Sequence, residues 1–197
     1  MNNNISDNLI KLSEEISKKS IINLDELPPY DLFLSQVTDF LNNKLNEEYT
    51  SNIIQNYIKG EVISKPEDGK KRGYSKDHLI QLILLNYMRP VLTTEEIKNV
   101  FNLAFNKINE KSDDLITWEF AYEIFADLQK ETLKNFVTTS QETEKKLKKL
   151  IDSKKLSEKD SQKLLVFLTV ISLIAQATAY KKLAHGILEE YESFKDK

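Results

Sequence analysis

The chain of 197 residues contains no cysteine, which excludes disulfide bonds, thiolate nucleophiles and cysteine-ligated metal centres. It has only two histidines, His78 and His185, which stand 107 positions apart, so a histidine metal cluster is not expected. Four glycines and four prolines are too few for an architecture rich in turns. These scarcities favour long helices, and they predict neither a bound metal nor a cofactor.

The chain also has no overall excess of basic residues. Its 28 lysines and arginines are outnumbered by 31 acidic residues, which gives a formal net charge of −3. Such a chain has no general attraction to nucleic acid, so a DNA-binding hypothesis depends on local charge. Because 40% of the residues are hydrophobic, the chain can bury a core.

The first residues show no basic stretch followed by an apolar run, so no signal peptide is predicted. One segment, residues 164–180, carries no charged side chain over 17 positions. That length is the short limit for a membrane span, which needs about 17–25 predominantly apolar residues. Because serine, threonine and glutamine interrupt the segment, we interpret it as a buried helix of a core or a dimer seam. We expect a cytoplasmic protein that does not enter a membrane.

Apolar residues recur at three- and four-residue steps over most of the chain, which predicts an all-α fold. Capping boxes, which satisfy the free backbone N–H groups of a helix start, are expected at residues 93–96 and 139–142. The loop 64–73 holds three of the eight glycines and prolines and is where a small β-hairpin is expected. The predicted helices comprise residues 5–16, 30–44, 51–59, 75–89, 93–108, 118–136, 139–152 and 157–194.

The predicted helix 51–59 has the two faces that a DNA-recognition helix requires. Its apolar side chains recur at offsets 0, 1, 4 and 5 and can dock on a domain. Asparagine and glutamine amides can bond adenine N6 and N7 together, and lysine can reach guanine acceptors or phosphate. A threonine before the helix can cap it by accepting a backbone N–H. The residues predicted to contact DNA from this helix and its start are Thr50, Ser51, Asn52, Gln55, Asn56 and Lys59.

A basic loop follows this helix. Residues 50–76 contain six basic and three acidic residues, so the local net charge is +3, whereas the rest of the chain carries −6. Such a loop is typical of a wing that lies on the DNA backbone, where its cations neutralise phosphates. The residues of the loop predicted to contact DNA are Lys70, Lys71, Arg72 and Tyr74.

Residues 50–57 (TSNIIQNY) and 72–79 (RGYSKDHL) resemble a MerR-type winged helix-turn-helix, and residues 92–98 are similar to the start of that family's next helix. The resemblance spans roughly residues 33–105 and implies a regulator that binds a near-palindromic DNA site as a homodimer. The sequence departs from the family pattern within the recognition helix. Gln55 and Asn56 stand where MerR proteins usually carry arginine and tyrosine.

Residues 28–38 (PPYDLFLSQVT) resemble an uncharacterised family of low-GC Gram-positive bacteria, the YkrK-like proteins. This resemblance implies a transcription regulator and supplies no ligand. We divide the chain into an N-terminal helix (1–24), a MerR-like winged helix-turn-helix (25–110) and a helical dimerisation or effector region (111–197). The effector, a small molecule or a protein, is left unspecified.

Two other function classes stay open. A helical protein-interaction module would use the helix-turn-helix only as a scaffold and would lack salt-sensitive DNA binding. An enzyme would need the acidic face of Glu119, Glu123 and Asp127 to gather a divalent metal. Such a face is usually solvated, and no histidine motif completes it, so we predict no catalytic activity. The favoured prediction is an all-α protein: a winged helix-turn-helix with a very small β-hairpin wing, followed by a C-terminal helical bundle, that binds double-stranded DNA.

Overall fold

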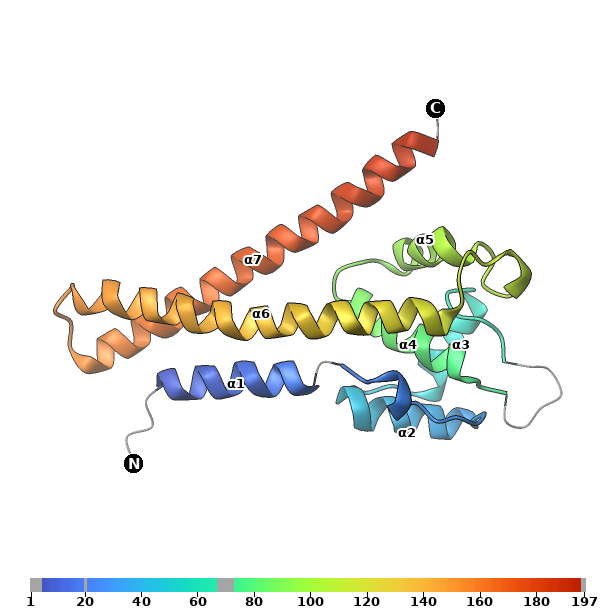
Figure 1. Cartoon of the computed structure of the whole chain (residues 1–197), viewed down its shortest axis with the longest axis horizontal. Coiled ribbons are helices and arrows are strands. Elements are labelled where there is room, and N and C mark those ends of the chain that lie inside the picture. Colours follow the sequence, from blue (N-terminus) through green and yellow to red (C-terminus); the bar gives the residue numbers. More distant parts are fainter. Residues whose placement is uncertain (1–4, 20, 67–72, 196–197) are drawn as a thin grey trace. The chain divides into compact units, whose positions relative to one another are not determined.

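The computed structural model describes residues 5–19, 21–66 and 73–195 (Figure 1). Within these ranges the fold is all-α, with seven α-helices, two short 3-10 helices and no β-strand. The chain divides into two compact units. One comprises Lys19–Lys130, and the other comprises Met1–Lys18 together with Glu131–Lys197. We call them the central unit and the bundle unit.

The central unit is built of short helices joined by tight loops (Figure 1). Two 3-10 helices, η1 (Leu24–Glu26) and η2 (Lys111–Asp113), lie in its connecting segments. Its α-helices are α2 (Leu34–Leu45), α3 (Ser51–Lys59), α4 (Lys76–Met88), α5 (Thr94–Phe105) and the first part of α6 (Trp118–Asp152).

Helix α4 lies at the centre of this unit. Seven of its 13 residues are buried, as expected for a helix that is apolar around most of its circumference.

Aromatic contacts join α5 to the start of α6, where Phe105 stacks on Trp118 with 3.4 Å between ring centroids. The Tyr122 hydroxyl donates to the backbone oxygen of Ile22 at 2.6 Å, so α6 also holds the segment that precedes α2.

Several helix starts follow the local sequence. The Thr50 hydroxyl accepts the Ile53 N–H at 3.3 Å, and α3 covers the predicted residues. The capping box at residues 93–96 is confirmed at the start of α5. Helix α2, by contrast, begins at Leu34 and not at residue 30, because Leu32 is held in an isolated antiparallel β-bridge with Tyr74.

The β-hairpin expected over residues 64–73 is not seen in the described part of this segment. Val62 and Ile63 precede the loop, and both are buried. Their N–H groups donate to the Tyr57 oxygen at the end of α3, at 2.9 and 3.4 Å. At the other end, the N–H and oxygen of Tyr74 are used in the bridge to Leu32. The residues before the loop therefore form their backbone hydrogen bonds with α3, and Tyr74 after the loop forms them with the segment before α2. The two sides of the loop do not pair with each other as a hairpin would require.

The capping box expected at residues 139–142 does not begin a helix. Helix α6 runs unbroken through these residues for 35 positions. Its sequence contains neither glycine nor proline, so nothing interrupts the helix before this motif. The Thr138 hydroxyl donates to the Lys134 oxygen at 3.2 Å, a bond that threonine makes inside a helix. The predicted pair of helices is therefore one helix.

The bundle unit contains α1 (Ile5–Lys19), the second part of α6 and α7 (Glu158–Lys195). Ser157 caps α7, because its hydroxyl accepts the Asp160 N–H at 3.2 Å. Among the side chains that the structure describes in this unit, Ile151 and Leu165 are buried, but most of α7 is not.

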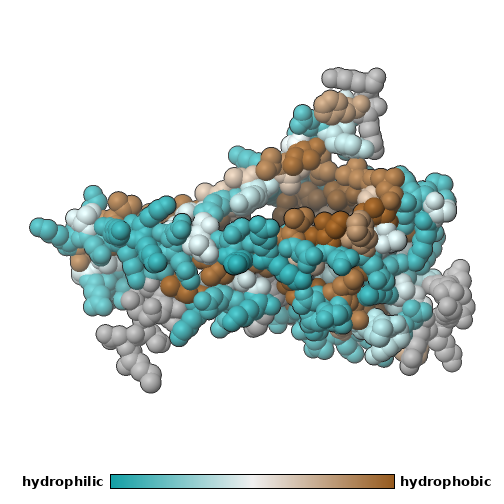
Figure 2. Space-filling view, viewed as in Figure 1, coloured by the Kyte–Doolittle hydropathy of each residue, from teal (hydrophilic) through white to brown (hydrophobic). Residues whose placement is uncertain are grey.

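Apolar side chains lie exposed along α7, and Figure 2 shows them as brown surface on this helix. Phe167, Ile171 and Ile174 are 57%, 49% and 60% exposed. By length and composition α7 could cross a membrane, and it is the one such helix in the described ranges. Only 6% of an apolar stretch of 18 residues in this helix is buried. Within the bundle unit, the predicted burial of the apolar run 164–180 is therefore seen for only a small part of it.

Candidate nucleic-acid interface

The turn between α2 and α3 is fixed by side-chain bonds to the backbone. Asn46 ends α2 in the left-handed conformation, with a φ of 54°. The Asn42 amide then bonds the backbone of Tyr49 twice: its nitrogen donates to the Tyr49 oxygen at 3.0 Å, and its oxygen accepts the Tyr49 N–H at 2.6 Å. These contacts set the direction in which α3 leaves the turn.

Tyr49 anchors this turn to α4. Its side chain is buried, and its hydroxyl donates to Asn86 Oδ1 at 3.1 Å. The Arg89 guanidinium lies 5.1 Å from the Tyr49 ring centroid and forms an ion pair with Glu47. Burial raises the pKa of Tyr49 above its ordinary range, so the phenol stays a neutral donor.

Sequence reasoning missed Tyr49, although a signal was present. The residue stands immediately before the Thr50 cap, and Ile54 stands at the fourth helical position. Apolar residues at these two positions form the hydrophobic staple that fixes how a chain enters a helix. Both side chains are buried, as such a staple requires.

Helix α3 separates its apolar and polar side chains as predicted. Ile54 is fully buried, and the other apolar residues of α3 pack against the same core. The amide and lysine side chains on the opposite face are all exposed, and none of them bonds to another described residue. They are Asn52, Gln55, Asn56 and Lys59. Thr50 and Ser51 are exposed at the helix start, where the Thr50 hydroxyl is used by the cap.

Among the described side chains of the central unit, the free positive charge lies at the end of α3 and at the start of the loop that follows it. Lys59 and Lys65 are exposed and make no ion pair within the described chain. The other lysines and arginine of this unit whose side chains are described each pair with a carboxylate. These are Lys44, Lys76, Arg89, Lys98, Lys107, Lys111 and Lys130.

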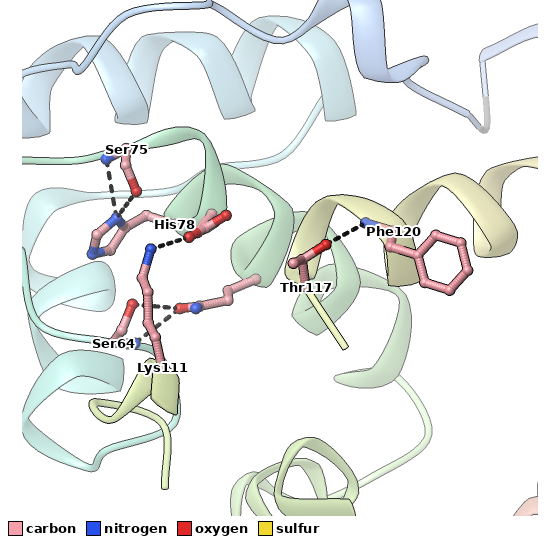
Figure 3. A network of polar contacts seen from close by, with 8 residues as sticks. Ser64, Ser75, His78, Lys111, Thr117 and Phe120 are labelled. Carbon is pink, nitrogen blue, oxygen red and sulfur yellow. Dashed lines mark hydrogen bonds and ion pairs between the residues drawn. The ribbon is translucent and has the colours of Figure 1, made fainter. Parts of the chain in front are cut away.

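The start of the basic loop is fastened to the buried amide of Gln81, as Figure 3 shows near Ser64. The Gln81 oxygen accepts the Ser64 N–H at 2.8 Å and the Ser64 hydroxyl at 3.0 Å. The Lys65 N–H donates to Asn109 Oδ1 at 2.8 Å. Gln81 lies within an apolar run, and a lone amide there is the signal that sequence reasoning overlooked. The predicted wing residues Lys70, Lys71 and Arg72 lie outside the described residues.

The other end of the loop leads into the core. The structure places Tyr74 inside the unit, 8% exposed, with its ring 5.5 Å from that of His78. His78 is also buried, and its Nδ1 accepts the Ser75 N–H at 3.0 Å (Figure 3). Burial lowers the pKa of His78 and keeps the ring neutral, which suits the acceptor role of Nδ1. Tyr74 is thus not on the exposed surface with the α3 amides.

The acidic residues considered for catalysis lie on the surface of α6. Glu119 pairs with Lys76 at 3.3 Å, and Asp127 pairs with Lys130 at 3.0 Å. No group of three or more histidine, cysteine, aspartate or glutamate side chains that could hold a metal ion occurs in the described residues. Each of these ion pairs is an ordinary feature of a solvated helix face.

Comparison with known proteins gives one family and one curated relative. Residues 22–125, a little over half of the chain, match the family described as "Domain of unknown function (DUF1836)". The uncharacterized protein YkrK of Bacillus subtilis (strain 168) is 27% identical over 176 residues, which are 79% of this chain and 72% of YkrK. No solved structure matches the chain. The match covers the whole of α2 to α5, and the chain therefore belongs to the DUF1836 family.

Proposed function

We propose that this protein is a DNA-binding transcription regulator that reads the major groove with α3. The observation that carries the proposal is the exposed face of that helix, where three amides and one lysine have no partner in the described chain. An amide that only keeps a helix surface hydrated does not require the helix to be held rigidly. Here the turn before α3 is held by Asn42 and the buried Tyr49, so the helix that carries these amides is held at a fixed orientation within the central unit. Bidentate recognition of adenine needs such an orientation.

The distribution of charge supports the same surface. Lys59 and Lys65 stand close to one another in sequence and are free to neutralise phosphates, whereas the other described cations from residue 44 to residue 130 are already paired. Electrostatic contacts to phosphate carry no sequence information but supply much of the affinity. We propose that Lys70, Lys71 and Arg72 add to this charge, and that the loop 64–73 takes the place of a MerR-type wing.

A homodimer completes the proposal. On α7, Leu165, Thr169 and Ser172 belong to the face turned toward the interior of the bundle unit. Phe167, Ile171 and Ile174 repeat at offsets 0, 4 and 7 and form a separate stripe on another face.

A second copy of this chain is the occupant we propose for that stripe, because a palindromic site needs two recognition helices at a fixed separation. Burial of the stripe in a dimer is compatible with a cytoplasmic protein.

The test is selection of DNA from a random double-stranded library on the purified full-length protein, followed by binding curves at several salt concentrations. The proposal expects an enriched, near-palindromic sequence and an affinity that falls steeply with salt. Absence of both an enriched sequence and salt-sensitive binding would overturn it. That result would favour the alternative of a helical protein-interaction module, for which the exposed stripe of α7 is the supporting observation.

A further inference from the structure

The bundle unit contains a cavity that the proposed DNA interface does not use. Helices α1, α6 and α7 surround it, and its volume is about 430 Å³. Cavities of about 300–1,000 Å³ are typical of sites for small molecules. One part of the wall is apolar, with Leu9, Ile10, Ile16, Phe136 and Leu173.

The rest of the wall is unusually polar for the inside of a helical bundle. Three hydroxyl residues of α6, Thr139, Ser140 and Thr143, line it together with Thr169 of α7. The Thr169 hydroxyl is buried and has no hydrogen-bond partner among the described atoms. An unsatisfied buried hydroxyl destabilises a fold, so apolar residues here would serve a purely structural interface better.

Glu144 gives the cavity its charge. It is 5% exposed, and it is the one charged residue among the described residues that line the wall. Its Oε1 pairs with Lys148 one turn further along α6, at 3.0 Å, but Lys148 is not part of the wall. A carboxylate only accepts hydrogen bonds, so the ligand group that suits it is a cationic donor.

We propose that this cavity binds an amphipathic amine, with its protonated nitrogen at Glu144 and its hydrocarbon part against the apolar wall. The hydroxyls of α6 and α7 surround the polar end of such a molecule and can accept the remaining N–H groups. An ionised carboxylic acid would place two like charges together, and a neutral alcohol would donate one hydrogen bond that lacks the attraction between opposite charges. The ligand class is therefore set by one buried charge on an otherwise neutral wall.

The experiment compares three probes with the same hydrocarbon chain, namely octylamine, 1-octanol and octanoate, by isothermal titration calorimetry of the full-length protein. We expect saturable binding of one octylamine per chain, about tenfold or more tighter than octanol, and still weaker binding of octanoate. Glu144→Gln is expected to remove the preference for the amine over the alcohol. Glu142→Gln, an exposed neighbour on α6, is the control and should leave octylamine affinity unchanged.

A second variant fills part of the cavity with a larger side chain. Ser140→Leu should reduce binding of both octylamine and octanol, with the helical circular dichroism signal retained as the check of folding. Equal affinity for the three probes, unchanged octylamine binding in Glu144→Gln, or unchanged binding in Ser140→Leu would each overturn the proposal. Several bound octylamines per chain in all variants would assign the binding to the exposed surface of α7 and overturn it as well. All these readouts measure binding of a small molecule, so they do not depend on DNA binding.

Discussion

The side-chain amide of Asn42, near the end of α2, bonds both the N–H and the backbone oxygen of Tyr49, the residue that precedes the cap of α3. One side chain therefore replaces two backbone bonds that the turn cannot make for itself. This relationship connects the stability of the central unit with the orientation of the proposed recognition surface.

Removal of that amide should destabilise the protein. Asn42→Ala leaves the N–H and oxygen of Tyr49 without partners, and we expect a loss of about 1–3 kcal/mol in the free energy of unfolding. Urea denaturation followed by circular dichroism measures it. Asn43→Ala, one residue further on and exposed, is the matched control with an expected change within about 0.5 kcal/mol. Equal effects of the two substitutions would show that the bonds to Tyr49 do not matter.

The amides of α3 should determine which bases are preferred. Asn52→Ala and Gln55→Ala are each expected to relax the preference at individual operator positions, at a cost of about 1–3 kcal/mol per lost bidentate contact. Binding to a panel of single-base operator variants measures this. The exposed Asn99 of α5 provides the control, Asn99→Ala, which should change nothing. Uniform weakening across the whole panel would instead identify these amides as phosphate contacts.

The cations of α3 and of the basic loop should set the salt dependence of DNA binding. Lys59→Gln is expected to lower the slope of log affinity against log salt by about 0.9, the value for one lost phosphate contact. The triple substitution of Lys70, Lys71 and Arg72 to alanine should lower it by about 0.9 for each contact that is lost. Lys107→Gln removes a lysine that is already paired with Glu110 at 3.1 Å and should leave the slope unchanged. A slope that responds equally to all of these changes would reflect net charge alone.

The exposed stripe of α7 should hold the dimer together. Ile171→Lys and Ile174→Lys are expected to convert a dimer into a monomer in sedimentation experiments, because a charge at a packed seam stays unpaired when buried. Lys149→Glu, exposed on α6, should leave the dimer intact. A wild-type protein that is monomeric well above its operator affinity would disprove the seam. Cosedimentation of wild type with phosphatidylcholine vesicles would assign the stripe to a membrane.

His78 should make the protein less stable in acid. Burial lowers its pKa below the ordinary value of 6.5, so the unfolded chain binds the proton more readily than the folded one. The contribution of the neutral ring is complete above 6.5 and is lost as the pH falls below that value. Comparison of unfolding free energies at about pH 7.5 and about pH 5.5 should show this loss. His78→Asn should reduce the loss, and His185→Asn should retain it.

The local sequence determined where most helices of this protein begin and which faces they present. Thr50 caps α3 because its hydroxyl reaches an N–H only three residues away, and the box at residues 93–96 works over the same short range. The apolar and polar sides of α3 follow from helical periodicity alone. These features need no information from distant parts of the chain, so the sequence predicted them.

Tertiary contacts decided what the local patterns could not. Leu32 and Tyr74 are far apart in sequence but exchange two backbone hydrogen bonds. These bonds determine where α2 starts and why Tyr74 does not pair across the basic loop. The motif at residues 139–142 resembles the capping box at residues 93–96, but it does not start a helix because no break in α6 precedes it. A side chain such as Tyr74 or Gln81 has no preferred location of its own. Whether such a side chain is buried depends on which distant groups form hydrogen bonds with its polar atoms. Only the folded structure brings those groups together.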